Sequence, residues 1–357
     1  MFDIYKGKRI LVTGSAGFCG SWLCRWLSNL GAEVVEYGHP PRDTPNHYEL
    51  LGGVKSNIVD YISLREPVIL RPHDDLLSYS HLLDVIKFNR PDLIIHLAAK
   101  GIVARTLTEP HETFENNIMG ALNILEAYRL NKSVKGMVMV ATDKVYSIKG
   151  QKAYREDDEL GGIDPYSCSK VCVEHITKSY REHFGLNIAV ARAGNTIGGG
   201  DFTYKRLIPD IVKATIKGEK VVIRTPNATR PFQHVLEALH GYLLLGQHIL
   251  EGKDVNRAWN FGPNEGDMTV HEVLLTAQTI WPKVGWEIDT AQSHPAMDYL
   301  LNIDSTDAKT MLGWKPVWSI KEAVERTIGW YEAYYEKGVI NTDKDIEDFE
   351  NGLHSRS

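Results

Sequence analysis

The stretch that decides the fold is "RILVTGSAGFCG", residues 9–20. An apolar run typical of a buried strand leads into three glycines, and "SWLCRWLSNLG" then continues with the apolar spacing of a helix. Glycines between a strand and a helix permit a tight turn, and they let backbone N–H groups approach a pyrophosphate at the helix N-terminus. The stretch therefore predicts a dinucleotide-binding turn formed by Gly14, Gly17, Phe18 and Gly20.

The same alternation of strand and helix patterns continues through the first half of the chain. Further strand-like runs are "AEVVEYG" (32–38), "DLIIHLAA" (92–99), "GMVMVAT" (136–142) and "NIAVARAG" (187–194). Helical patterns at residues 112–130 and 166–184 separate the later runs. Such alternation predicts a parallel sheet covered by helices on both faces. We therefore expect an α/β protein with a Rossmann-type doubly wound parallel sheet and a smaller C-terminal α/β lobe.

The residue pattern changes beyond residue 194, where segments rich in turn-forming residues separate predicted helices from short predicted strands. We expect residues 1–194 to form the dinucleotide-binding domain with the catalytic residues. Residues 195–337 would form mainly a substrate lobe, with some segments returning to the first domain. Ser319 and Glu322 have the spacing of a capping box and predict the start of a helix. The polar residues 338–357 are expected to be a tail that lies on the surface or frays.

Composition excludes several classes of protein. The 357 residues contain 40 Lys and Arg and 46 Asp and Glu, a net charge of −6, which argues against a nucleic-acid partner. We find no apolar run of the roughly 18 residues that a membrane span needs, and the N-terminus has no signal-peptide pattern. The four cysteines form no CxxC pair and the histidines no HExxH motif, so we expect no metal site and a cytoplasmic protein.

The sequence leaves open which dinucleotide binds. The second predicted strand ends at Gly38, with Glu36 two residues earlier as a partner for the ribose of NAD. His39 and Arg42 follow that strand and would instead suit the 2′-phosphate of NADP. The predicted strand "VILRPHDDL" (68–76) would bring Asp75 and Leu76 to the adenine.

A group of reactive side chains follows the strand at residues 136–142. Thr142, Asp143 and Lys144 stand where a buried strand ends, and charged groups are costly there unless something pairs or uses them. "DPYSCSK" puts Tyr166 and Lys170 on one face of a helix, which Asp164 caps and Pro165 begins. Lys170 would lower the pKa of the Tyr166 phenol, so that this group takes a proton from a sugar hydroxyl that Thr142 also binds.

With these residues assembled, the chain resembles the extended short-chain dehydrogenase/reductases, the NAD-dependent epimerase/dehydratase family. The matching pieces are "TGSAGFCG", "HLAA", the strand end at Thr142, the Tyr166–Lys170 pair and "RAGNTIGGG". The resemblance implies NAD as cofactor, in contact with Ala98, Ala99, Tyr166 and Lys170 besides the glycine turn, and a nucleotide sugar as substrate.

Asp143 and Lys144 separate the branches of this family. A 4-epimerase has no use for them, whereas a 4,6-dehydratase needs an acid that releases the 6-hydroxyl and a base that removes the C5 proton. The resemblance assigns the acid to Asp143 and the base to Lys144. A lysine acts as a base at neutral pH only if desolvation or nearby positive charge lowers its pKa, and an ion pair between the two residues would oppose protonation of Asp143. The alternative reading of the two residues is a plain ion pair.

The resemblance is greatest to the CDP-glucose 4,6-dehydratase branch. The local matches are "AYREDDELGGIDPYS", "GNTIGGGDF", "NATRPFQHVLEAL", "WNFGPN" and "LGWKP". The chain departs from that branch in "KGIVARTL", residues 100–107, a loop that approaches the sugar. The expected reaction converts CDP-glucose to CDP-4-keto-6-deoxyglucose. The alternatives are an epimerase or a dehydratase of the same family acting on another nucleotide-linked hexose, and a dinucleotide sensor without activity.

By resemblance, Asn195 would contact the substrate diphosphate, and Arg206 and Leu207 would line the nucleotide site. Arg230 would bind phosphate, for which the forked donors of a guanidinium are suited. The family also implies a homodimer, in which the helices near residues 112–130 and 166–184 of two subunits would form a four-helix bundle.

Overall fold

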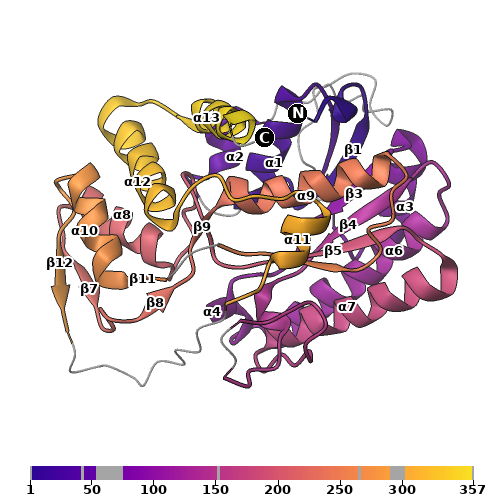
Figure 1. Ribbon diagram of the computed structural model, residues 1–357, viewed down its shortest axis with the longest axis horizontal. Coiled ribbons are helices and arrows are strands. Elements are labelled where there is room, and N and C mark those ends of the chain that lie inside the picture. Colours follow the sequence, from indigo (N-terminus) through magenta and orange to yellow (C-terminus); the bar gives the residue numbers. More distant parts are fainter. Residues whose placement is uncertain are drawn as a thin grey trace.

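The computed structural model describes residues 2–41, 44–53, 75–150, 153–263, 267–289 and 302–355. Arg42 and most of the strand expected at residues 68–76 lie outside these ranges. Within them, the central sheet has six parallel strands in the order β10-β5-β4-β3-β1-β2 (Figure 1). The strands are β1 (Arg9–Thr13), β2 (Glu33–Tyr37), β3 (Leu93–His96), β4 (Gly136–Val140), β5 (Ile188–Ala193) and β10 (Ala258–Phe261).

Helices cover both faces of this sheet because its strands are apolar on both sides. One face packs against α1 (Phe18–Asn29) and α9 (Val235–Leu250). The residues of α9 are nearly all buried. The other face packs against α3 (Tyr79–Asn89), α6 (Gly120–Arg129) and α7 (Pro165–Phe184). This arrangement confirms the predicted Rossmann-type fold. From β1 the strand order runs to β2 on one side and to β3 on the other, so that the order reverses between β1 and β3. Folds of this kind bind their ligands at this switch point, at the carboxyl ends of the strands.

The smaller lobe lies beside the carboxyl ends of the strands (Figure 1). Its helices are α8 (Leu207–Lys217), α10 (Val270–Ile280) and α12 (Ile320–Lys337). Three two-stranded ladders complete it: β7 (Val221–Ile223) with β12 (Trp286–Ile288), β8 (Thr229–Arg230) with β11 (Met268–Thr269), and β6 (Thr196–Ile197) with β9 (Gln233–His234). One apolar cluster contains both Ile10 of β1 and Trp330 of α12, so the lobe and the sheet share a core.

The remaining short elements connect these layers. They are η1 (Asp3–Tyr5), α2 (His47–Leu50), α4 (Val103–Thr106), α5 (Pro110–Phe114), η2 (Glu115–Met119), η3 (Asp143–Val145) and α11 (Thr306–Met311). The helix expected over residues 112–130 is therefore divided into α5, a π-helical turn and α6. The capping box at Ser319 and the Asp164 cap of α7 are both present as predicted. No helix in the described ranges is long and apolar enough to cross a membrane.

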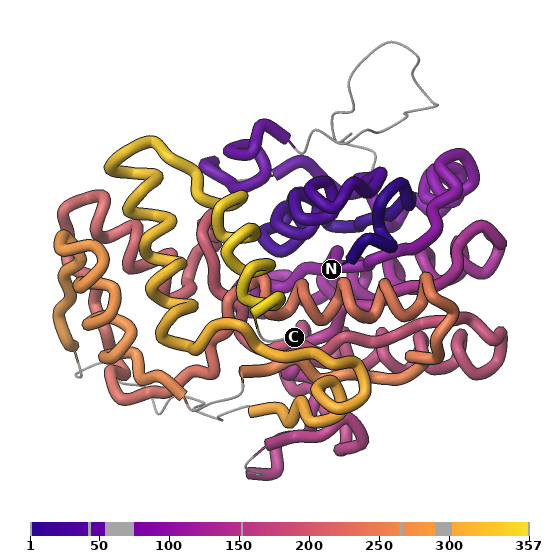
Figure 2. The backbone as a smooth tube through the Cα atoms, turned by 45° about the horizontal axis from the view of Figure 1, so that its top comes forward, coloured from indigo at the N-terminus to yellow at the C-terminus, as the bar shows by residue number. Residues whose placement is uncertain are grey.

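The expectation of a frayed C-terminal tail is wrong for α13 (Thr342–Ser355). Its buried residues Ile346, Phe349 and Leu353 recur at helical spacing, so that one face of an otherwise polar helix packs on the core. The Phe349 ring meets that of Trp26 in α1 edge-on, with centroids 5.6 Å apart. Figure 2 accordingly draws the yellow chain end beside the N-terminal segment.

Candidate active site

The glycine turn has the geometry that the sequence predicts. Gly14 has a φ of +72°, and a Cβ there would lie 2.8 Å from the Cα of Ala98. A Cβ on Gly20 would lie 2.0 Å from the carbonyl oxygen of Gly14, so α1 approaches the turn as closely as backbone atoms allow. Gly17 precedes α1 as its N-cap and offers no capping side chain, which leaves the first N–H groups of the helix for an anion. Phe18 packs against Gly198, whose Cβ would lie 3.1 Å from the Phe18 ring. These features fit a dinucleotide pyrophosphate.

The residues expected at the adenosine end lie together beyond β2. Tyr37 accepts the Gly14 N–H at its carbonyl, and its hydroxyl donates to the Asp75 carbonyl at 2.9 Å. The Asp75 carboxylate lies 3.6 Å from His39 Nε2, and Leu76 is buried against Gly120. Glu36 is buried and accepts the Tyr48 hydroxyl at 2.7 Å. Burial raises the pKa of Glu36 to about 7, and its place beside the ribose of the cofactor stays a prediction.

Thr142, Asp143 and Lys144 form a short turn directly after β4. Thr142 caps η3, with its Oγ1 accepting from the Lys144 N–H and donating to Asp143 Oδ1 at 3.0 Å. Asp143 is 3% exposed, and Lys144 is half-buried. Gly194 follows β5 and faces this carboxylate, since a Cβ there would lie 3.2 Å from Asp143 Oδ2. The glycine makes room for Asp143, a role that its place in "RAGNT" did not predict.

The electrostatics of Asp143 suit an acid. Burial raises the pKa of Asp143 to about 6, against the lowering effects of the Lys144 charge and of hydrogen bonds from Thr142 and backbone N–H groups. Desolvation therefore outweighs the neighbouring ammonium, which is the outcome that the sequence left open. Near neutral pH a substantial minority of the molecules carries a transferable proton on this group.

Tyr166 and Lys170 face the same turn from the first two turns of α7. Lys170 is 4% exposed and donates to the Val140 carbonyl of β4 at 2.9 Å, and burial lowers its pKa to about 8. The pKa of Tyr166 is raised to about 12 by burial, while hydrogen bonding with Thr142 and the charge of Arg206 lower it in part. Burial is the largest effect on the Tyr166 pKa, the Lys170 ammonium is directed at a carbonyl of β4, and the expected lowering of the Tyr166 pKa by Lys170 stays a prediction.

The loop at residues 100–107 reaches the site, as expected. A Cβ on Gly101 would lie 3.8 Å from Cε2 of Tyr166. Asn117, in the π-helical turn, accepts the Lys100 N–H at 2.7 Å and donates to Ser169 Oγ at 2.9 Å, so it joins the loop to α7. The Lys100 ammonium pairs with Glu112 and with Glu109. A buried asparagine within an amphipathic helix is the signal that would have identified Asn117 beforehand.

The predicted substrate residues fall into two places. Asn195 is exposed directly after Gly194, beside the Asp143 turn. Arg206 forms an ion pair of 3.2 Å with buried Asp201, and its charge lowers the pKa of Tyr166 in part. Leu207 begins α8. Cys19, which sequence reasoning missed, lies here as well, with its Sγ 3.8 Å from Thr196 Oγ1. Arg230 lies in β8, where its guanidinium donates to the Thr229 carbonyl.

The fold and the site together define a dinucleotide-dependent enzyme of the short-chain dehydrogenase class. The family model described as GDP-mannose 4,6 dehydratase matches residues 11–327. The CDP-glucose 4,6-dehydratase of Salmonella typhimurium is 34% identical, over 97% of this chain and 97% of that protein. The chain therefore belongs to the GDP-mannose 4,6 dehydratase family.

Solved structures agree on the fold. The dTDP-glucose 4,6-dehydratase DesIV of Streptomyces venezuelae, with NAD and TYD bound, has a TM-score of 0.74 and 23% identity, covering 92% of this chain and 99% of that one. A UDP-glucose-4-epimerase of Stenotrophomonas maltophila with bound NAD has a TM-score of 0.78 and 20% identity, over 92% and 99% of the two chains.

Proposed function

We propose that the chain is a nucleotide-sugar 4,6-dehydratase that uses NAD catalytically and converts CDP-glucose to CDP-4-keto-6-deoxyglucose. The observation that carries this proposal is the buried carboxyl of Asp143, next to Thr142 and facing the Tyr166 helix, with its pKa raised to about 6. An epimerase has no use for such an acid. The 34% identity to a CDP-glucose 4,6-dehydratase over almost the whole chain supports the choice of nucleotide.

The residues present fit the cofactor. Gly14, Gly17 and Gly20 would hold its pyrophosphate at the N-terminus of α1, with Phe18 beside them, and Asp75 with Leu76 would meet its adenine. Ala98 and Ala99, directly after β3, would lie along the ribose and nicotinamide half. When bound, the nicotinamide ring would supply the redox chemistry, as hydride acceptor for C4 and as hydride donor for C6. Both NAD-bound relatives described above belong to this fold, and we accordingly propose NAD.

Tyr166, Lys170 and Thr142 would carry the proton of the C4 hydroxyl. Tyr166 accepts this proton while Thr142 binds the same oxygen. A phenol whose pKa is raised to about 12 needs a neighbouring cation to take part near neutral pH. Lys170 has a pKa lowered to about 8 and is therefore a cation at neutral pH, one helical turn from the phenol.

Asp143 and Lys144 would carry the elimination that distinguishes a dehydratase. Once C4 is a ketone, the C5 proton becomes acidic, and Lys144 removes it. Asp143 donates its proton to the 6-hydroxyl, which leaves as water as the C5–C6 double bond forms. The Lys144 ammonium returns its proton to C5 when C6 receives the hydride, so that the double bond is saturated again. The ketone stays in the product, and the proton that Tyr166 took from the C4 hydroxyl passes through solvent to Asp143, which restores both groups.

The remaining assignments complete the proposal. Residues 195–337 would mainly bind the nucleotide sugar, through Asn195, Arg206, Leu207 and Arg230. The protein would act in the cytoplasm as a homodimer, with α6 and α7 of two subunits forming a four-helix bundle. Met119 at the end of η2 and Phe184 at the end of α7 support that arrangement, since both are large apolar residues with exposed side chains.

The substitution Lys144→Met tests the proposal. The shape of the side chain is nearly kept while the amine is lost, so C4 oxidation should continue and water elimination should stop. Mass spectrometry after borodeuteride reduction detects the 4-keto sugar, and unreduced samples report loss of water. A Lys144→Met protein that eliminates water at the wild-type rate would contradict the role of Lys144. A wild-type protein that changes the sugar without losing water would contradict the dehydratase.

A further inference from the structure

A buried ion pair lies behind the candidate active site and takes no part in the chemistry above. Arg192 of β5 donates from Nε to Glu174 Oε1 at 2.9 Å and from Nη2 to Glu174 Oε2 at 2.5 Å. The side chains are only 4% and 6% exposed. Two parallel hydrogen bonds of this kind fix the angle between guanidinium and carboxylate as well as their distance. Glu174 stands one helical turn after Lys170, so the pair fixes that part of α7 against the sheet.

The same guanidinium also holds the residue that follows the acid–base turn. Arg192 Nη1 donates to the Tyr146 hydroxyl at 2.8 Å and to the Glu156 carbonyl at 2.9 Å. The Tyr146 hydroxyl in turn donates to Asn260 Oδ1 at 2.7 Å. Tyr146 is 1% exposed and follows η3 directly, so its ring and hydroxyl fix one end of the turn that carries Asp143 and Lys144.

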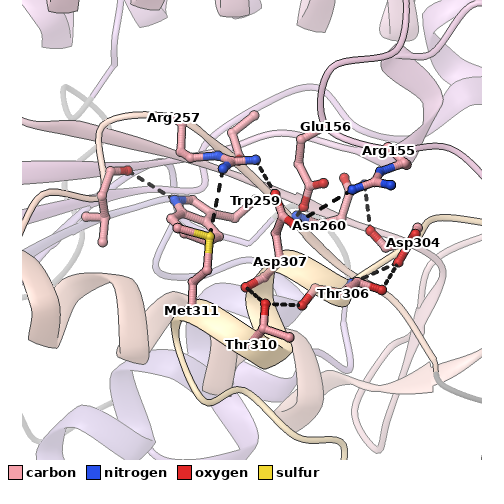
Figure 3. A network of polar contacts seen from close by, with 12 residues as sticks. Arg155, Glu156, Arg257, Trp259, Asn260, Asp304, Thr306, Asp307, Thr310 and Met311 are labelled. Carbon is pink, nitrogen blue, oxygen red and sulfur yellow. Dashed lines mark hydrogen bonds and ion pairs between the residues drawn. The ribbon is translucent and has the colours of Figure 1, made fainter.

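The outer end of this network is anchored in turn. The Asn260 backbone N–H donates to Glu156 Oε1 at 2.9 Å, and its side-chain amide donates to the carbonyls of Tyr154 and Asp304 (Figure 3). Asn260 is fully buried in β10, so every partner of the Tyr146 hydroxyl belongs to the rigid sheet. A buried polar network in which the members are satisfied specifies one arrangement of the elements it joins.

The turn needs such an anchor because its own backbone bonds are weak. The Val145 N–H to Thr142 carbonyl and the Tyr146 N–H to Asp143 carbonyl distances are both 3.4 Å, beyond the usual range for an N–H···O bond. Bonds of ordinary length hold the residues on either side of the turn, from the Ala141 N–H to the Ala191 carbonyl and from the Gly161 N–H to the Val145 carbonyl, both at 2.8 Å. The backbone bonds within the turn therefore contribute little to fixing the acid and the base between these two points.

We propose that Tyr146, Arg192 and Glu174 form a positioning unit that holds the Asp143–Lys144 turn in register with the Tyr166–Lys170 helix. One guanidinium contacts both halves of the catalytic group, the turn through Tyr146 and the helix through Glu174. This inference rests on the proposed function, because the register matters only if groups on both elements act on one sugar. The charge of Glu174 also raises the pKa of Lys170 against the effect of burial, in keeping with their closeness.

The test compares Tyr146→Phe with Tyr154→Phe. The two rings are buried and stacked 5.2 Å apart, and each substitution removes one hydroxyl. Among the described residues, the Tyr154 hydroxyl accepts the Lys149 N–H and makes no contact with Arg192, Glu174 or Tyr146 Oη. Tyr146→Phe is preferred to removal of Arg192 or Glu174, because a buried charge left without its partner would risk unfolding the protein.

For Tyr146→Phe we expect kcat for water elimination to fall roughly tenfold to a hundredfold, since a misplacement of about 1 Å has such an effect. KM for CDP-glucose should stay within about twofold of wild type, because the Tyr146 hydroxyl is buried among Arg192 and Asn260. Tyr154→Phe should keep both constants. Equal kcat values for the two variants, with an active wild type, would overturn the positioning unit and leave the proposed function intact.

Hydrogen exchange gives a readout that needs no turnover. Amides of residues 142–146 should exchange faster in Tyr146→Phe than in wild type or Tyr154→Phe, because the turn loses its anchor. Equal exchange in the three proteins would overturn the proposal even if the wild type formed no keto sugar. An inactive wild type in which exchange rises only in Tyr146→Phe would contradict the proposed function and retain the anchor.

Discussion

The proton on Asp143 predicts how turnover depends on pH. Burial raises the pKa of Asp143 to about 6, above the usual value of an aspartate. At pH 7 roughly one molecule in ten then carries the proton, and each further unit lowers that share about tenfold. If Asp143 donates to the departing hydroxyl, the rate of water elimination relative to that of C5-proton exchange should fall about tenfold per unit above pH 7, because exchange needs only the base.

The substitution Asp143→Asn should remove this dependence together with most of the rate. An amide cannot donate the proton of an acid, so we expect elimination to slow by about 10²–10⁴-fold. Exchange of the C5 proton with solvent should continue, because Lys144 remains as the base. The assay is a single-turnover reaction with saturating CDP-glucose in D₂O, quenched and analysed by mass spectrometry from pH 5.5 to 8.5.

Asp345 provides a matched control in the same protein. It is a second buried aspartate whose pKa burial raises to about 6, and it pairs with Arg326 in the packing of α13, far along the chain from the turn. The substitution Asp345→Asn should leave the pH profile of elimination unchanged. The reasoning would be refuted if the ratio of elimination to C5-proton exchange in the wild type were constant between pH 6 and 8, or if Asp143→Asn kept more than a tenth of the elimination rate.

Three further outcomes follow from the structure. Gly14→Ala should abolish NAD binding measured by calorimetry, because its Cβ would lie 2.8 Å from the Ala98 backbone, whereas Gly7→Ala, with a φ of +69° and nothing within 4 Å, should bind NAD normally; equal binding would contradict the glycine cradle. Burial lowers the pKa of His240 to about 3, so the unfolded chain binds a proton that the folded one does not, and stability falls as pH drops below about 6.5. Between pH 7 and pH 5 the free energy of unfolding, measured by urea denaturation, should therefore fall by about 2 kcal/mol less in His240→Phe than in wild type. An equal fall in the two proteins would contradict the burial of a neutral ring. Arg206→Ala should raise KM for CDP-glucose roughly tenfold with kcat nearly unchanged in steady-state assays, since it removes binding that ground state and transition state share, and an unchanged KM would remove Arg206 from the substrate site.

Local sequence patterns predicted the elements that position the site. "RILVTGSAGFCG" defined β1, the glycine turn and the start of α1, because strand, glycines and helix are contiguous there. "DPYSCSK" defined the start of α7 through its aspartate cap and proline. Tyr166 and Lys170 fall on one helical face for the same reason, and they meet the Thr142 turn because parallel strands end at one edge of the sheet.

Features that depend on distant contacts were not predictable in this way. The apolar face of α13 consists of only three residues, and the sequence does not show that they pack on the surface of α1. The raised pKa of Tyr166 comes from its burial, and the Lys170 ammonium is directed at the Val140 carbonyl; the sequence gives neither that burial nor that direction. The joining of Arg192 to Glu174 and Tyr146 unites three segments that carry no common motif.

The most direct test of the proposed function is mass spectrometry of reactions with CDP-, UDP-, GDP- and dTDP-glucose and catalytic NAD. We predict loss of one water from CDP-glucose, with no net consumption of NAD. Loss of water from another nucleotide sugar alone would retain the dehydratase and contradict the nucleotide, and would direct attention to the loop at residues 100–107. A change of the sugar without loss of water, or no reaction with any of the four, would contradict the assignment of Asp143 and Lys144 as the eliminating acid and base.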